Sequence, residues 1–454
     1  MTFAQSMKLI DKYNVPGPRY TSYPTVPFWD NSPNNQQWEE HVKSSFKTYN
    51  EKDGISVYIH LPYCESLCTF CGCTTRITIN HAVEEPYIDA LLKEWQLYLN
   101  LFEEKPIIKE VHLGGGTPTF FSPENLTKLI EGIKSTTEFS KDIDLGFEAN
   151  PRTTTIEHLK TMKDLGFKRL SLGIQDFDPL VQKTINRVQS FSLVKQVTDW
   201  ARSIGYTSIN FDLVYGLPNQ TIGSIENTID LVNLLRPDRI AYYSYAHVPW
   251  VKPGQRSFTE HDLPEADVKH NMYKLGKQLL TSAGYIEIGM DHFALPHEEL
   301  TVAYQTGQMH RNFMGYTTQP SKLMIGLGVS AISDTWTAFG QNIKDVETYL
   351  EKVNSGTIPI FRGHILTKED LLIRELILDL MCHFQTDIPL SSDLNVDEIF
   401  NTLGELKQDR LIKLKGNSIK VTNAGKPFVR NICMALDQRL RRAQPGVQIF
   451  SMTV

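Results

Sequence analysis

The hydrophobic and polar positions of this 454-residue chain alternate between two kinds of segment through its central part. A short run of β-branched or apolar residues is followed by a longer amphipathic stretch, and this repeats about six times. Strands that alternate with helices indicate right-handed βαβ units and a parallel sheet, either doubly wound or closed into a partial barrel. The predicted strands are 55–60, 108–113, 144–148, 169–175, 209–216 and 239–246.

The polar residues at the strand ends favour the barrel. In β/α barrels, the chemistry lies on the loops that lead from the strands into the helices. A cysteine-rich loop follows the first predicted strand, GGGTPT follows the second and EANP ends the third. The fourth ends at Gln175 and Asp176, the fifth carries Asp212, and the sixth runs into YAHVP. We therefore expect an α/β fold, a partial (β/α)6 barrel with one composite active site.

The flanking segments have different patterns. Residues 15–29, VPGPRYTSYPTVPFW, are too rich in proline for a regular helix, and we expect an extended arm over the barrel. From about residue 366, two helical patterns precede two short strands around a Gly-Asn turn and a further helix, which is typical of a winged-helix-like, mainly helical domain. The predicted divisions are 1–54 (arm and lead-in), 55–290 (barrel core), 291–360 (extension and connector) and 361–454 (C-terminal domain).

The net charge and the hydrophobicity of the sequence exclude several classes of function and location. Winged-helix modules often bind DNA, but the net charge of −6 argues against nucleic acid, and a packing domain or lid is favoured. The sequence has neither a signal-peptide pattern nor an apolar run long enough to span a bilayer, so we expect a cytoplasmic protein without a membrane partner. In that reducing compartment, clustered thiols indicate a metal site and not disulfides.

Four of the six cysteines lie in CESLCTFCGC, residues 64–73, with the spacing C-x3-C-x2-C-x-C. Zinc sites usually combine two C-x2-C pairs over a longer connection. A loop folded over a cubic iron–sulfur cluster can reach three of its irons, and Cys64, Cys68 and Cys71 would then leave one iron open. Structural zinc and four unligated thiols remain alternatives.

The three-cysteine spacing after the first strand resembles the radical S-adenosylmethionine (radical SAM) superfamily. The wider set of motifs is YIHLPYCESLCTFCGC, PGPRYTSYPT, GGGTPTF, EANP, GIQDF, DLVYGLP, YAHVP, GMDHFA, HRNFMGYTTQ and RNICM. Together these motifs resemble the oxygen-independent coproporphyrinogen III oxidases (dehydrogenases) over nearly the whole chain. Related haem chaperones on the same barrel typically lack the fourth cysteine, here Cys73, and the PGPRYTSYP arm.

The resemblance implies one 4Fe-4S cluster and two SAM molecules. It also implies a reaction of haem and porphyrin biosynthesis, in which a 5′-deoxyadenosyl radical takes a hydrogen atom from a substrate propionate. Loss of carbon dioxide and an electron leaves a vinyl group, and two rounds convert coproporphyrinogen III to protoporphyrinogen IX while two SAM are cleaved to methionine and 5′-deoxyadenosine. The alternatives are a related radical SAM enzyme that modifies another tetrapyrrole, or a haem chaperone. The expected partners are coproporphyrinogen III and a reducing donor such as flavodoxin or ferredoxin, with the chain a monomer.

Residue-by-residue match to the family implies the SAM sites. The glycines of GGGTPT have no side chain, so the SAM amino acid group can approach the backbone closely. Carboxylates can accept hydrogen bonds from ammonium or ribose hydroxyl groups, and arginine can bind a carboxylate. A lone acid is more often a helix cap or a solvated charge, and a lone arginine is often a surface charge. Around the cluster-bound SAM the match places Tyr58, Gly115, Glu148 and Ile332. Around the second it places Phe70, Gly116, Thr117, Gln175, Arg187, Asp212 and Ala246.

The four substrate propionates require positive charge. Arg19, Arg256 and Arg311 lie in PGPRYTSYP, GQRSF and HRNFMGY, outside the regular elements, and we predict that they contact the substrate.

Overall fold

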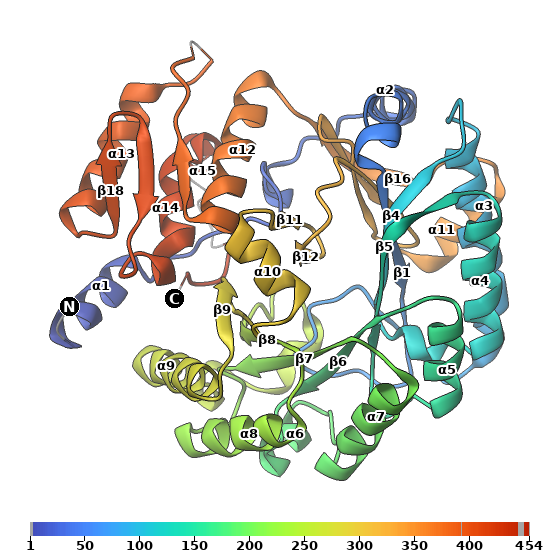
Figure 1. Ribbon diagram of the computed structural model, residues 1–454, viewed down its shortest axis with the longest axis horizontal. Helices are drawn as coiled ribbons and strands as arrows, with labels where there is room; N and C mark the ends of the chain where they lie inside the picture. Colours follow the sequence, from blue (N-terminus) through green and yellow to red (C-terminus); the bar gives the residue numbers. More distant parts are fainter. Residues whose placement is uncertain (1–2, 392, 444–448, 454) are drawn as a thin grey trace.

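The computed structural model describes residues 3–391, 393–443 and 449–453 and shows one long, curved sheet (Figure 1). Six parallel strands cross its middle in the order in which they occur in the chain. A doubly wound sheet would reverse its strand order at a switch point. The six strands do not, which confirms the predicted partial (β/α)6 barrel. They are β1 (Ile55–Leu61), β4 (Ile107–Gly115), β5 (Glu138–Ala149), β6 (Arg169–Gln175), β7 (Ser208–Tyr215) and β8 (Arg239–Ser244).

Helices cover the outer face of these strands (Figure 1). Their starts are set by N-cap side chains that accept backbone N–H bonds, as at Ser122, Thr155 and Thr221. No helix in the described part of the chain is long and apolar enough to cross a membrane. The helices are α3 (Glu84–Leu99), α4 (Pro123–Ser135), α5 (Ile156–Asp164), α6 (Pro179–Thr184), α7 (Phe191–Ile204), α8 (Ile222–Leu235) and α9 (Ala266–Ser282).

Short strands extend the sheet at both ends. On one side, β13 (Leu323–Leu327) runs parallel to β1, and β14 (Ile332–Asp334), β15 (Ala338–Asn342) and β16 (Ile360–Ile365) follow antiparallel. On the other side, β10 (His292–Ala294) and β9 (Ile286–Gly289) continue from β8. Of these strands, β10 and β14 have only three residues each and are too short to show a period in the sequence. The remaining elements of this part are α2 (Asn35–Asp53), β2 (Tyr63–Cys64), β3 (Arg76–Ile77), α10 (Glu299–Thr306), β11 (His310–Asn312), β12 (Gly315–Thr317) and α11 (Val346–Asn354).

The C-terminal part has its own apolar core and lies at one side of the barrel (Figure 1). Its predicted hairpin is present, with Gly416 in the left-handed turn (φ 59°), and a third strand pairs with it. The winged-helix-like, mainly helical arrangement is therefore confirmed. The elements are α12 (Lys368–His383), β17 (Gln385–Asp387), α13 (Val396–Gln408), β18 (Ile412–Lys415), β19 (Ser418–Val421), α14 (Val429–Leu436) and α15 (Gln438–Ala443).

The N-terminal segment connects the two parts. After α1 (Phe3–Tyr13) the chain is irregular, as its prolines predict, apart from a 3-10 turn at Val26–Phe28. Tyr20 is buried in the C-terminal core and donates a hydrogen bond to Asp437 (3.0 Å). Trp29 stacks on Phe339 of β15, with ring centroids 5.1 Å apart. The arm therefore packs against both the C-terminal domain and the barrel extension.

One buried ion pair ties α15 to α12. Asp370 is fully buried and accepts hydrogen bonds from Arg439 Nε (2.6 Å) and Nη2 (2.7 Å). Burial alone would raise the pKa of Asp370, but hydrogen bonds from Arg439, His364 and Thr367 hold it far below its ordinary value.

Asp370→Asn should therefore lower the free energy of unfolding by about 3 kcal/mol at pH 7, because the Arg439 charge loses its partner. A carboxyl group whose pKa is lowered by folding stabilises the folded state at pH values above its pKa in the unfolded chain. This stabilisation is lost as the pH falls to the pKa of the carboxyl group in the folded protein. The difference from the parent should thus shrink below about pH 4, where the unfolded carboxyl takes up its proton. Urea unfolding at several pH values measures this. Asp164→Asn, at an exposed carboxylate ending α5, is the control; an equal loss in both variants would contradict the role of the ion pair.

Candidate active site

A cavity of about 650 Å³ opens at the carboxyl ends of the barrel strands. The strand ends predicted to carry chemistry meet in its wall: Gly115 of β4, Glu148 of β5, Gln175 of β6 and Asp212 of β7. Parallel strands bring their carboxyl ends to one edge, which is why residues far apart in the chain converge there.

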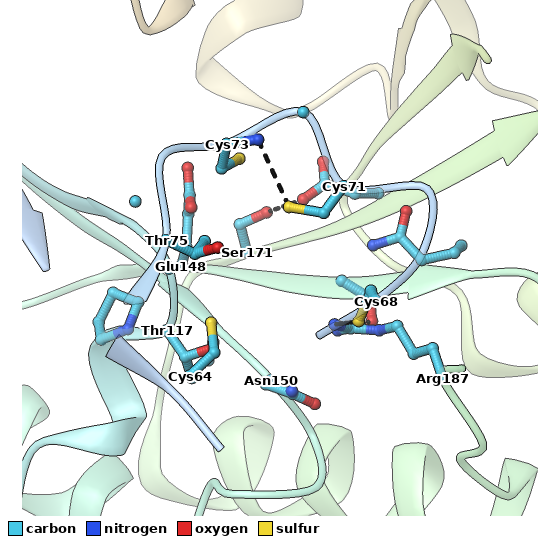
Figure 2. A pocket seen from close by; sticks show the side chains of 18 of the residues that line it. Cys64, Cys68, Cys71, Cys73, Thr75, Thr117, Glu148, Asn150, Ser171 and Arg187 are labelled. Atoms are coloured by element: carbon cyan, nitrogen blue, oxygen red, sulfur yellow. Dashed lines mark hydrogen bonds between the residues drawn. The ribbon is translucent and has the colours of Figure 1, made fainter. Parts of the chain in front are cut away.

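The cysteine loop forms one side of this cavity (Figure 2). Strands β2 and β3 pair at its base and close the loop. The thiols Cys64, Cys68 and Cys71 all line the cavity and are partly exposed to it. Cys64 Sγ lies 3.2 Å from Thr117 Oγ1, and a backbone bond from Cys71 N to Cys68 O (3.1 Å) tightens the turn. The three thiols are thus presented by one short, internally bonded loop.

The fourth cysteine acts on the third. The backbone N–H of Cys73 donates to Cys71 Sγ at 3.4 Å (Figure 2). Hydrogen bonding from the Cys73 thiol and backbone lowers the pKa of Cys71, whereas burial raises the pKa of Cys64 to about 11. Cys73 thus favours the thiolate form of Cys71, a role that the spacing left unexplained.

The surroundings of these thiols fit an anionic group. Arg152 and Arg187 line the same cavity, and each has a buried Nε–H without a hydrogen-bond partner. Arg187 Nη1 lies 3.7 Å from Cys68 Sγ. Three thiolates on a compact iron–sulfur cluster carry negative charge that these guanidinium groups would stabilise, so the donor set fits a cluster.

The glycines at the end of β4 allow close packing against the segment from His60 to Tyr63, which leads into the cysteine loop. A Cβ on Gly116 would lie 2.5 Å from Pro62 O, just before the first cysteine. Gly115 has φ +116°, and a Cβ there would lie 2.9 Å from the His60 ring. Both positions must therefore lack a side chain so that the neighbouring segments of the protein can pack against them. Both glycines also line the cavity.

Two carboxylates face the cavity from neighbouring parts of the barrel. Glu148 Oε1 lies 3.5 Å from His112 Nε2, and its side chain is 44% exposed. Asp212 accepts hydrogen bonds from Ser171 Oγ and Asn210 Nδ2, both at 2.9 Å. Burial and the nearby Glu148 raise the pKa of Asp212 to about 6. Neither acid caps a helix, so both are available to a cationic or hydroxyl-bearing ligand.

Gln175 and Arg187 lie together on another wall. Gln175 has φ +69°, a conformation that a non-glycine residue adopts at a cost and that often marks functional sites. Arg187 Nη2 donates to Gly173 O (2.7 Å), which fixes the guanidinium beside the cavity.

Eight of the eleven predicted SAM residues line the cavity. Tyr58 stacks on the lining residue His112, at 6.3 Å between ring centroids. Ile332 packs in the cluster around Trp29, and Ala246 O accepts a hydrogen bond from Gln255 (3.3 Å). These last three lie outside the lining set. The eight are Phe70, Gly115, Gly116, Thr117, Glu148, Gln175, Arg187 and Asp212.

The three arginines predicted for the substrate are not in the cavity lining. Arg256 is exposed and donates to Pro249 O. Arg19 and Arg311 each lie over a tyrosine of the cavity wall: Arg19 over Tyr243 at 6.0 Å, and Arg311 over Tyr316 at 4.5 Å.

Sequence reasoning missed other charged and aromatic lining residues. Arg169 and Arg239 begin two barrel strands and pair with Asp144 (2.7 Å) and with Glu298. The only sequence signal was a charge at an inward-facing position of an apolar strand. Arg152 lies in the loop after EANP, which gave no such signal. Further lining residues are His112, Tyr243, His292 and Tyr316.

Comparison with known proteins gives concordant matches. Residues 58–232 match the radical SAM superfamily model, and residues 366–428 match the HemN C-terminal domain. The chain is 37% identical over 455 residues to the oxygen-independent coproporphyrinogen III oxidase of Escherichia coli K12, covering 99% of this chain and 98% of the relative. It is 39% identical to the protein of the same name from Helicobacter pylori 26695, with 98% of each chain covered. The solved structure of coproporphyrinogen III oxidase (HemN) from E. coli, described as a radical SAM enzyme, superposes with a TM-score of 0.88 at 35% identity, over 95% of this chain and 98% of that one.

Proposed function

Because the chain belongs to the oxygen-independent coproporphyrinogen III oxidase family of radical SAM enzymes, we propose a specific role in that reaction for each part of its active site. The enzyme is an oxidoreductase that converts two propionate side chains of coproporphyrinogen III to vinyl groups, giving protoporphyrinogen IX. The observation that carries the residue assignments is the convergence of three loop thiols and the strand-end acids and glycines on one cavity.

Cys64, Cys68 and Cys71 hold the 4Fe-4S cluster. When bound, the cluster and SAM supply the one-electron chemistry that removes a hydrogen atom from a propionate. Arg187 and Arg152 supply positive charge beside the thiolates.

The residues around the cavity bind and orient two SAM molecules. Glu148 suits the ammonium or hydroxyl groups of the SAM beside the cluster, with Gly115 providing a bare backbone and Tyr58 and Ile332 supporting the wall. Asp212 suits ribose hydroxyls of the second SAM, and Arg187 suits its carboxylate. Phe70, Gly116, Thr117, Gln175 and Ala246 complete the second site.

Arg187→Met should raise the KM for SAM about tenfold or more, because a charge-assisted hydrogen bond to the SAM carboxylate is lost, while the iron–sulfur absorbance stays because all three cysteine ligands are kept and Arg152 remains beside them. Anaerobic kinetics at varied SAM measure it. Lys183→Met, at an exposed lysine of α6, is the control. An unchanged KM for SAM, with only the KM for coproporphyrinogen III raised, would move Arg187 to the substrate site.

The substrate propionates need cationic surroundings. Arg19 and Arg311 act through the wall tyrosines Tyr243 and Tyr316 that they cover. Arg311 is buried, with its Nε and Nη1 unpartnered, so it also has donors free for a carboxylate. Arg256 lies at the surface, and its contact with the substrate stays a prediction.

The remaining parts of the assignment concern context. The domain divisions are those given by the sequence, with arm residues packed into the C-terminal core. A flavodoxin- or ferredoxin-type protein reduces the cluster, and the protein works as a cytoplasmic monomer without nucleic acid or membrane partners. The net charge of −6 supports the absence of nucleic acid.

An anaerobic assay with reconstituted cluster, reductant, SAM and coproporphyrinogen III tests the whole proposal. The expected result is protoporphyrinogen IX with two 5′-deoxyadenosines per product. An intact cluster without product would refute the assignment, and stoichiometric haem binding without SAM cleavage would favour a haem chaperone.

A further inference from the structure

A second, smaller chamber of about 60 Å³ is lined by residues of α9, β9 and α14. Figure 1 shows where these three elements lie. The chamber brings together charged residues of three sequence motifs, none of which itself lines the active-site cavity. Arg19 comes from PGPRYTSYP, Asp291 from GMDHFA and Arg430 from RNICM. The arm, the barrel edge and the C-terminal domain thus each contribute a charged side chain to one enclosed space.

The charge in this chamber is unbalanced. Four cations line it: Arg19, Lys269, Lys426 and Arg430. Of the two lining carboxylates, Glu287 is already bound by Lys277 Nζ (2.7 Å) and by Tyr273 OH (3.1 Å). Asp291, 3.3 Å from Arg19, is the one lining carboxylate left among the described residues to face the four positive charges. Backbone carbonyls accept hydrogen bonds from Arg430 (Gly17, Pro18, Met452 and Thr453) and from Arg19 (Ser244). Carbonyl oxygens carry no net charge, so the excess of positive charge in this largely buried space still favours an anion.

The chamber also has unused hydrogen-bonding groups. Lys269 Nζ donates to Tyr245 O (2.9 Å), and Lys426 Nζ donates to Tyr304 OH (3.2 Å). An ammonium group has three N–H donors, so both lysines keep donors in reserve. His270 also lines the chamber; it is only 9% exposed, and its buried Nε2 has no partner.

Mutual repulsion among the buried cations also favours a bound anion. Burial, together with Arg19 and Arg430, lowers the pKa of Lys269 to about 8. Burial and Arg19 lower the pKa of Arg430 to about 10. A bound anion would offset both the desolvation and the mutual repulsion of these groups.

We propose that this chamber binds a small oxyanion of the phosphate or carboxylate class, which bridges the arm, the barrel edge and the C-terminal domain. A single water needs roughly 10–15 Å³ of such space, so the chamber admits a phosphate-sized group and excludes a nucleotide or a tetrapyrrole ring. Arg19 lies between the chamber and Tyr243 of the active-site wall. The bound anion therefore holds the arm against the substrate cavity.

The oxyanion could be free in solution or could be a propionate of the substrate. The structure favours a free ion, because Tyr243 lines the main cavity and not the chamber, and the two spaces share no lining residue.

Titration of the full chain with inorganic phosphate, at an ionic strength held constant with chloride, tests the site. We expect saturable binding by calorimetry, close to one phosphate per chain, and a rise in Tm that chloride does not produce. Lys269→Met and Lys426→Met should each weaken phosphate binding about tenfold or more, because each removes a charged donor. Lys195→Met, at an exposed lysine of α7 paired with Asp199, should bind phosphate like the parent. Equal responses to phosphate and chloride, or equal affinities in all variants, would overturn the proposal.

Two further measurements distinguish loss of phosphate binding from misfolding of the variant, and a free anion from a propionate of the substrate. Without phosphate, Lys269→Met should keep or raise the Tm, because one of several repelling buried cations is gone; a clear fall would show that the protein alone satisfies Lys269. Saturating phosphate should leave the KM for coproporphyrinogen III unchanged. Competition would make the chamber a propionate subsite and overturn the separate site. Phosphate binding is read without turnover, so it stands or falls independently of the decarboxylation.

Discussion

Cys71→Ala should reduce product formation to background and remove the broad iron–sulfur absorbance near ~400 nm after reconstitution. The thiol lies on the cavity wall beside Cys64 and Cys68, and hydrogen bonding from Cys73 lowers its pKa. Two remaining thiols cannot hold a cluster that needs three. Iron and sulfide content, absorbance and 5′-deoxyadenosine formation measure the loss.

Cys73→Ala is the matched control for this change. Its backbone N–H, which donates to Cys71 Sγ, is kept, and so are all three predicted ligands. The absorbance of the reconstituted protein should therefore remain. If Cys73→Ala lost the cluster and Cys71→Ala retained it, the division of the loop into three ligands and one supporting cysteine would be wrong.

Gly116→Ala should reduce turnover about 100-fold or more, because small displacements of an active-site element are that costly. The added Cβ would lie 2.5 Å from Pro62 O and 2.9 Å from Tyr63 O, both backbone atoms that no side-chain rotation can move away. The strand end must shift, and with it the segment that carries Cys64. We also expect a stability loss of about 1–3 kcal/mol from overpacking.

Gly404→Ala is the matched control for the glycine prediction. Gly404 lies in α13, and a Cβ there meets nothing within 4 Å. Alanine is the better helix former, so the fold should be unchanged or slightly more stable and turnover should stay at the parent level. Circular dichroism, thermal unfolding and the anaerobic assay together separate the two variants. Parent-like activity in Gly116→Ala would show that β4 and the segment that leads into the cysteine loop can separate without consequence.

Periodicity predicted the repeating part of the fold well. All six barrel strands appear where the β-branched runs lie, and β6 has the predicted bounds. The short strands β14 and β10, which lie outside the six barrel strands, were missed, because three residues carry no readable period and pair only once the sheet exists. The third strand of the C-terminal sheet, β17, was missed for the same reason.

The candidate site was predicted from local spacing and family resemblance, with different success for different chemistry. The cysteine loop was readable because its ligands are close in the chain. The arginines were harder to predict. Arg187 was predicted from the family resemblance and lines the cavity, and Arg19 and Arg256 were predicted because they lie in unusual loops but do not line it. Arg152, which lines the cavity, was missed because its position depends on how distant loops pack.

The sequence by itself determined the order of elements, the three-plus-one cysteine spacing and the strand ends that carry polar residues. These properties depend on neighbours within a few positions of the chain. Only the tertiary structure decided that Gly116 must lack a side chain because Pro62 packs against it, and that Arg19, Asp291 and Arg430 meet in one chamber. Those relations depend on distances between segments that only the curved sheet and the docked C-terminal domain bring together.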